Sequence, residues 1–297
     1  MGKYIITGAN GLLGKEIICQ TLEHDDRAEF LAISNNCEKL MQQFGADSRI
    51  RCCSWTELEH ADLKDFTAAI HCAFSRSENG VELHKALVLT DRLLDAVGRA
   101  GVPAIVISSR SIYGQEDTLP WTEETEVGPN SLYALAKDAE ELLTRQAARF
   151  YGSKMTVIRL AGLIGIGMDA RIVSKMTKSA VENHSIKVVG GKQMFAMLDL
   201  RDAASGICAL LKLPPEQWAE TYNLGSGITY TLAEMAQVIA EVGTDEFGLN
   251  IKITNEKKDI TLLDGMDCRL FYKDTGWRPA HSLRDTVITL YSFYLNA

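Results

Sequence analysis

Residues 7–14 read Thr7-Gly8-Ala9-Asn10-Gly11-Leu12-Leu13-Gly14, directly after the apolar run Tyr4-Ile5-Ile6. The apolar run predicts a β-strand and the amphipathic stretch that follows predicts a helix, which places three glycines in the turn between them. Without side chains, such a turn lets the backbone approach a pyrophosphate, and the start of the helix supplies free amides. The sequence therefore predicts a dinucleotide-binding turn. Its expected cofactor contacts are Gly8, Asn10, Gly11, Leu12, Leu13 and Gly14.

Short apolar runs alternate with longer amphipathic stretches over the first 160 residues. Such alternation is typical of strand–helix–strand units around a parallel sheet. The predicted strands are Tyr4–Thr7, Phe30–Ser34, Ile50–Cys53, Ala68–Cys72, Ala104–Ser108 and Met155–Leu160. We therefore expect an α/β fold with a doubly wound parallel sheet of the Rossmann type.

The pattern changes after residue 162, where glycines interrupt the apolar runs. Helices are predicted near Ala203–Leu213 and Leu232–Val242, with a strand at Thr221–Leu224. We expect a dinucleotide-binding domain over residues 1–163, to which residues 200–226 return. Residues 164–199 and 227–297 are expected to form a smaller C-terminal substrate-binding lobe.

Composition narrows the possible partners. The chain has 297 residues and a formal net charge of −8, and this acidic balance argues against nucleic acid. The seven cysteines include no CxxC pair, so we expect reduced thiols, and no His or Cys spacing indicates a metal site. No signal peptide and no apolar run of about 20 residues is found, so we expect a cytoplasmic protein without a membrane partner.

Tyr133 and Lys137 lie four residues apart in a predicted helix, one turn from each other on the same face. A nearby ammonium stabilises a phenolate, which suits proton exchange near neutral pH. Ser109 follows the fifth predicted strand, at the sheet edge where open parallel sheets bind ligands. A hydroxyl there can stabilise charge on a reacting oxygen. Ser108 and Ser111 are alternatives for this role, and Ser111 is also an expected substrate contact.

These motifs together resemble the extended short-chain dehydrogenase/reductase family, which is also described as the NAD-dependent epimerase/dehydratase family. The glycine spacing, the Tyr-x-x-x-Lys pair and the serine four residues before Tyr113 carry the resemblance, and Gly276-Trp277-Arg278-Pro279 resembles the family's ending. The resemblance implies that Tyr133 transfers a proton, Lys137 also holds the nicotinamide ribose, and Ser109 orients the substrate oxygen. It also places Cys72 and Ala73 beside the nicotinamide.

The adenosine end of the cofactor site is expected at Ser34 and Asn35. NAD-binding relatives usually have an acid at the position of Ser34, where it accepts a bond from the ribose hydroxyl. Without a carboxylate at this position, no negative charge repels a 2′-phosphate, and Lys39 is close enough in sequence to reach one. We therefore expect NADP or NAD, with a slight preference for NADP.

Three departures from the family pattern concern the substrate and the reaction. Ala86 and Phe195 replace an Asn and an Arg that many sugar-nucleotide enzymes of the family carry. Arg110 and Ser111 stand where the family's dehydratases have Asp-Glu, so elimination of water is not expected. We expect a reductase, dehydrogenase or 4-epimerase that acts on a sugar-like or other polar carbonyl or alcohol.

The alternative is a catalytically silent protein that senses NAD(P) on the same fold. The intact Ser109, Tyr133 and Lys137 argue against it, since a sensor needs no proton donor. The resemblance further implies a homodimer that pairs through the helices expected at Val81–Ala100 and Ser131–Tyr151.

Overall fold

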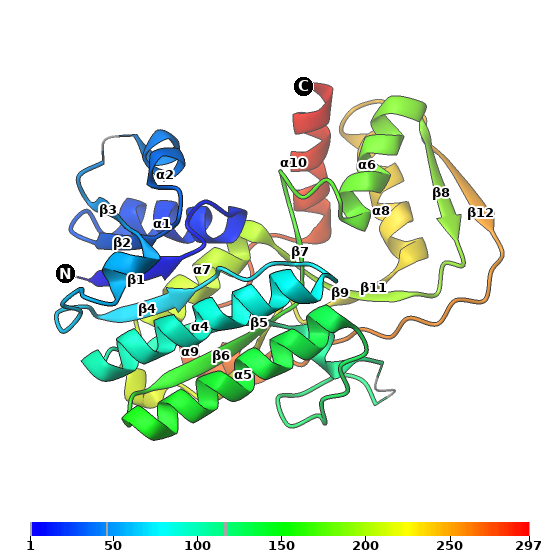
Figure 1. Ribbon diagram of the computed structural model, residues 1–297. Coiled ribbons are helices and arrows are strands. Elements are labelled where there is room, and N and C mark those ends of the chain that lie inside the picture. The colour runs from blue at the N-terminus through cyan, green and yellow to red at the C-terminus, as the bar shows by residue number, and fades with distance from the viewer. Residues whose placement is uncertain (1, 46, 116–117, 297) are drawn as a thin grey trace.

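The computed structural model describes residues 2–45, 47–115 and 118–296. Its centre is a parallel sheet of seven strands in the order β10-β6-β5-β4-β1-β2-β3 (Figure 1). The strands are β1 (Lys3–Thr7), β2 (Glu29–Ile33), β3 (Ile50–Cys53), β4 (Ala68–His71), β5 (Ala104–Ser109), β6 (Met155–Leu160) and β10 (Thr221–Leu224). The strand order reverses between β1 and β4, as in a Rossmann sheet, and the predicted fold class is confirmed.

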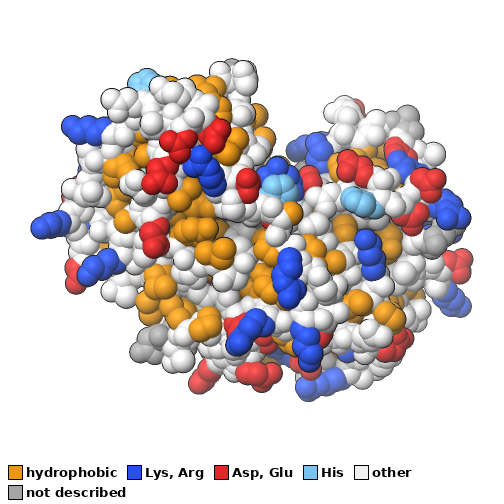
Figure 2. All heavy atoms as spheres, turned by 180° about the vertical axis from the view of Figure 1, so that it is seen from behind, with side chains coloured by type: hydrophobic (Ala, Val, Ile, Leu, Met, Phe, Trp, Pro, Cys, Tyr) orange, Lys and Arg blue, Asp and Glu red, His pale blue; other side chains and the backbone are white. Residues whose placement is uncertain are grey.

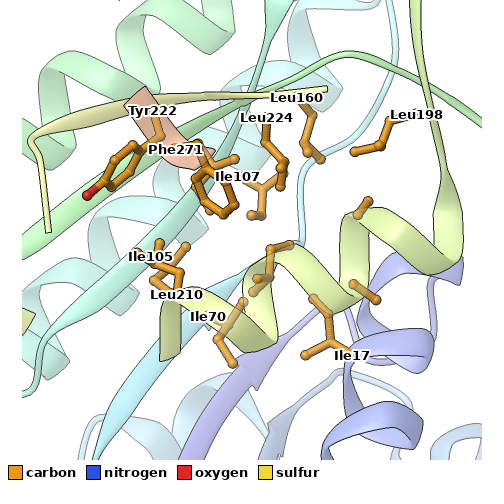
Figure 3. Close-up of a cluster of buried hydrophobic side chains, with 14 of the residues drawn as sticks. Ile17, Ile70, Ile105, Ile107, Leu160, Leu198, Leu210, Tyr222, Leu224 and Phe271 are labelled. Carbon is orange, nitrogen blue, oxygen red and sulfur yellow. The ribbon is translucent and has the colours of Figure 1, made fainter. Parts of the chain in front are cut away.

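Both faces of the sheet are buried, because neighbouring residues of a strand point to opposite sides. Ile6 faces a core shared with α1 (Leu12–His24) and α7 (Leu200–Leu211), whereas Ile5 faces a second core shared with α4 (Gly80–Ala100). Figure 3 shows the first core, with Ile70, Ile107 and Leu210 among its labelled side chains. Helix α5 (Leu132–Tyr151) packs beside α4.

The C-terminal part surrounds a third core. It contains α6 (Ile172–Asn183), α8 (Leu232–Asp245), α10 (Leu283–Leu295) and two small sheets. One sheet holds β7 (Gly162–Ile164), β9 (Met194–Asp199) and β11 (Thr229–Thr231), and the other holds β8 (Ser185–Val189) and β12 (Lys252–Glu256). Seen from behind, the surface is hollowed between this part and the part built on the large sheet (Figure 2).

Segments from late in the chain return to the large sheet. β10 pairs with β6, α7 packs against α1, and α9 (Arg269–Thr275) contacts β10. The remaining elements are α2 (Cys37–Phe44), α3 (Trp55–Leu58), η1 (Arg110–Tyr113) and η2 (Pro215–Gln217). Between η1 and α5, Glu116 and Asp117 lie outside the described residues.

The expectation that all cysteines are reduced is wrong for one pair, since Cys37 and Cys52 form a disulfide. Cys37 begins α2 directly after β2, and Cys52 lies on β3, which pairs with β2. Strand pairing thus brings together two cysteines separated by 15 positions, with Cα atoms 5.5 Å apart. Among the described residues, no helix is long and apolar enough to cross a membrane.

Candidate active site

A cavity of about 530 Å³ opens at the carboxyl ends of β4, β5 and β6. It lies beside the point where the strand order reverses, which is where open α/β sheets bind ligands. Six of the predicted site residues meet there. They are Leu13, Cys72, Ser109, Ser111, Tyr133 and Lys137.

The glycine turn has the shape of a cofactor cradle. A Cβ on Gly14 would lie 2.4 Å from the Gly8 oxygen, and Gly8 has a φ of +73° and lies against Cys72 and Ala73. Gly11 caps α1 without a side-chain bond, and within the described chain no side chain accepts the amides of that first turn. Free amides and a positive helix end fit a pyrophosphate. Leu12 is exposed at the same helix start.

The predicted adenosine end lies at the tip of β2. The Ser34 hydroxyl accepts bonds from the Asn10 side chain and the Asn36 amide, both at 3.0 Å. The other side-chain atom of Asn10, Oδ1, is buried without a hydrogen-bond partner among the described residues. Asn35 is exposed beside this cluster. These polar groups fit the ribose hydroxyls of a dinucleotide.

Tyr133 and Lys137 lie in the first turns of α5, which begins after Ser131, whose hydroxyl accepts the Ala134 amide. The Tyr133 ring is half-buried and meets the edge of Phe74. Lys137 is almost fully buried, and its ammonium donates to the Ile107 carbonyl at 2.7 Å and to Glu140 at 2.6 Å. The same nitrogen lies 3.9 Å from the centre of the Phe74 ring. The ammonium is therefore fixed from three sides.

Ser109 ends β5 and caps the short helix η1. Its oxygen accepts bonds from the Ser111 amide at 3.2 Å and the Ser111 hydroxyl at 3.0 Å. The Ser109 proton therefore remains free for an oxygen in the cavity. Ser111 orients Ser109, while Ser108 is buried and donates to Glu141, which leaves Ser109 as the serine suited to the reacting oxygen.

Several residues of the cavity were not predicted. Arg76, Glu78 and Arg171 line it, and Arg110 lines it while pairing with the fully buried Asp264 at 3.0 Å. Burial raises the pKa of Asp264 to about 6, although the nearby Arg110 acts in the opposite direction. Arg76 and Glu78 follow β4 in a segment without helical or strand periodicity, so their sequence carried no signal. Burial also raises the pKa of the Cys72 thiol to about 12, which keeps it protonated at neutral pH.

Known proteins similar in sequence agree with a dinucleotide-binding fold and a cavity beside the glycine turn. Residues 4–225 match the NAD dependent epimerase/dehydratase family. The chain is 24% identical over 208 residues to a dTDP-glucose 4,6-dehydratase of Streptomyces griseus, covering 69% of this chain and 62% of that protein. It is also 24% identical over 318 residues to UDP-glucuronic acid decarboxylase 1 of Arabidopsis thaliana, covering 99% and 70%.

Solved structures share the fold. UDP-glucuronic acid 4-epimerase from Bacillus cereus, in complex with UDP-glucuronic acid and NAD, superimposes with a TM-score of 0.82 at 19% identity and covers 99% of both chains. dTDP-glucose 4,6-dehydratase from Bacillus anthracis, in complex with NAD, gives 0.81 at 18% identity and covers 100% of this chain and 97% of that chain. Both contain NAD, so the expected preference for NADP finds no support.

The exclusion of a dehydratase is wrong, because the similar proteins include dTDP-glucose 4,6-dehydratases. That exclusion assumed that an acid and a base must occupy the positions of Arg110 and Ser111. Another segment of the chain supplies a carboxylate, since Glu78 lines the cavity. With residues 4–225 matched and the cavity built as described, the chain belongs to the NAD dependent epimerase/dehydratase family, a group of extended short-chain dehydrogenases/reductases.

Proposed function

We propose that the chain is an NAD-dependent enzyme that acts on the sugar of a nucleotide sugar, at one carbon bearing a hydroxyl. The observation that carries this proposal is the meeting of Ser109, Tyr133 and Lys137 around one cavity next to the glycine turn. A silent sensor of the cofactor would not need this set of groups.

Three residues of the cavity have separate roles at the substrate hydroxyl: one binds it, one takes its proton and one stabilises the resulting phenolate. Ser109 donates a hydrogen bond to the reacting oxygen and holds it in place. Tyr133 takes the hydroxyl proton, and the Lys137 ammonium stabilises the phenolate that makes this possible. NAD, when bound at the glycine turn, supplies the acceptor for the hydride. Whether the oxidised sugar is then reduced, dehydrated or decarboxylated is a property of the rest of the cavity.

Positive charge in the cavity supports a nucleotide sugar as substrate. Arg76, Arg110 and Arg171 line it, and guanidinium groups bind phosphate oxygens well. Many family members use other groups where this chain has Ala86 and Phe195. Here Ala86 is buried in α4, and Phe195 lines a separate cavity with Lys187. A diphosphate is therefore proposed to rely on the arginines of the main cavity.

Turnover of a panel of nucleotide sugars tests the function. The purified chain is incubated with NAD and UDP-glucuronic acid, dTDP-glucose, UDP-galactose or UDP-N-acetylglucosamine, and products are separated by chromatography and identified by mass and NMR. Conversion of at least one sugar, abolished by Tyr133→Phe, is expected. Tight NAD binding with no conversion of any sugar would contradict the proposal. Competition between NAD and NADP in the binding assay tests the cofactor, and NAD is expected to bind more tightly.

A homodimer through α4 and α5 is also proposed. Apolar side chains are exposed along these helices, with Leu135 at 51%, Leu142 at 53% and Phe150 at 81%. Such a stripe suits the interface that family members form. Light scattering at micromolar concentration should give twice the chain mass, and Leu142→Glu should reduce it to one chain. The cytoplasmic location stays a prediction from the sequence.

A further inference from the structure

Glu140 is a fully buried carboxylate directly behind the site. It lies seven residues after Tyr133 and three after Lys137, on the face of α5 that meets the sheet. One oxygen, Oε2, accepts the Lys137 ammonium at 2.6 Å. The other, Oε1, accepts the Thr90 hydroxyl at 3.3 Å and lies 3.4 Å from Nε2 of His71. The carboxylate is thus held between α5, α4 and β4.

Glu140 is ionised in this environment. Burial acts to raise the pKa of its carboxyl, but Lys137 and His71 outweigh burial and the pKa lies below its usual value. Thr90 donates to the carboxylate and its oxygen lies 2.9 Å from Nε2 of His71, so the His71 proton belongs on Nε2, which faces both Thr90 and Glu140. Nδ1 of His71 then accepts the Thr7 hydroxyl at 2.7 Å.

The chain of bonds reaches the cofactor turn. Thr7 directly precedes Gly8, and its oxygen also accepts the Ala73 amide at 3.2 Å. Glu140, His71 and Thr7 therefore connect the ammonium of Lys137 to the backbone that cradles the dinucleotide. All three of these residues are buried.

We propose that Glu140 is a positioning residue of the active site, which holds Lys137 in place and offsets its charge, and so sets the pH at which Tyr133 gives up its proton. This inference rests on the proposed roles of Tyr133 and Lys137. Without Glu140, the ammonium would stabilise the Tyr133 phenolate more strongly. Seven residues along a helix correspond to a rise of about 10 Å, and a unit charge at about that distance, at an effective dielectric constant of about 20, moves a proton equilibrium by about one pH unit.

The other charged or titratable groups around the pair are few. β4 contributes His71 and the protonated Cys72, and the segment after β4 contributes Arg76 and Glu78. Arg110 of η1 and Arg171, just before α6, also line the cavity. Glu78 accepts the backbone amide of Tyr133 at 3.4 Å. From α4, the side chain that reaches Glu140 is the neutral Thr90. A substitution at Glu140 changes the surroundings of His71 and Thr90, which contact its carboxylate, and leaves Glu78 and Arg110 with their own contacts.

Glu141 offers a matched control, because it is equally buried and is the next residue of the helix. It pairs with Arg159 at 2.9 Å and Arg145 at 3.3 Å and accepts the Ser108 hydroxyl, and it has no bond to Lys137. One residue further along the helix turns it about 100° away from the Glu140 direction. Removing its charge alters stability without releasing the ammonium.

The test is a pH titration of tyrosinate absorbance in the NAD complex, with Tyr133→Phe subtracted to isolate the Tyr133 signal. Glu140→Gln should lower the midpoint by about one pH unit and also weaken NAD binding, because the ammonium loses its anchor, whereas Glu141→Gln removes a charge at a similar distance and should lower the midpoint without weakening NAD binding. An unchanged or raised midpoint in folded Glu140→Gln would overturn the proposal. No substrate is needed, so this result stands apart from the nucleotide-sugar assay.

A second variant keeps the proposal testable if Glu140→Gln does not fold. Glu140→Asp retains the charge but withdraws it by one methylene from Lys137. The tyrosinate midpoint should then stay near that of the wild type, while NAD binds at least about threefold more weakly because the ammonium is misplaced. Unchanged NAD affinity in a folded Glu140→Asp protein would also overturn the proposal.

Discussion

Replacing Tyr133 by Phe should stop catalysis and leave the protein otherwise intact. In the described part of the chain no hydrogen bond to the Tyr133 hydroxyl is seen, and its ring packs edge-on against Phe74. Phe retains that ring contact. The free energy of unfolding should therefore change by less than about 0.5 kcal/mol, and NAD affinity should change less than about twofold.

The loss should appear in kcat. General acid–base groups contribute about 10²- to 10⁴-fold, which corresponds to about 3–5 kcal/mol of barrier. Steady-state kinetics on a nucleotide sugar that the wild type converts measures this, with urea unfolding to monitor stability. Tyr151→Phe at the far end of α5 is the control, because its hydroxyl bonds to Asp95, away from the cavity, and activity should persist. If Tyr133→Phe kept more than about a third of kcat where chemistry limits the rate, the proton-transfer role would be refuted.

Four further substitutions test other parts of the structure. Lys137→Ala should weaken NAD binding as well as turnover, since the ammonium serves both, and calorimetric NAD titration beside kinetics would show this. Gly14→Ala should reduce NAD affinity at least about tenfold, because its Cβ would meet the Gly8 backbone at 2.4 Å, whereas Gly80→Ala has open space and should bind normally. Asp264→Asn should flatten the pH dependence of the free energy of unfolding. In the wild type the pKa of Asp264, raised to about 6, stabilises the native state at low pH, and this contribution of about 2–3 kcal/mol is lost as the pH rises from 4 to 6. Urea unfolding at several pH values measures the difference. Arg159→Met should lower the free energy of unfolding by about 3–5 kcal/mol, because the buried Glu141 carboxylate loses its main partner. An unchanged midpoint of urea unfolding would contradict this.

The sequence was informative wherever neighbouring residues carry the signal. Apolar runs located the strands of the first 160 residues to within one or two positions. Local motifs also singled out Ser109, Tyr133 and Lys137, which line one cavity, and their catalytic roles stay a prediction.

Contacts between distant segments were not predictable in this way. Asp264 reaches Arg110 from a position 154 residues later, and neither residue belongs to a periodic pattern. The Cys37–Cys52 disulfide depends on the pairing of β2 with β3 rather than on a cysteine motif. Glu140 carried no such signal, because the leucines of α5, among them Leu135 and Leu142, are exposed, and the face that meets the sheet carries Lys137 and Glu140 instead.

The path of the chain between the two parts of the molecule has a mechanical consequence. The polypeptide leaves the large sheet after β6, returns for α7 and β10, leaves again, and returns once more for α9 before ending in α10. Several stretches of the polypeptide therefore connect the two parts, and bending one of them requires the others to bend with it. Truncation after residue 163 would remove β10, α7 and α9 from the large sheet and expose core residues that they cover, among them Ile17, Ile105 and Ile158. The two parts are thus expected to unfold in a single cooperative transition, and any closure over a substrate is expected to be a small, concerted movement.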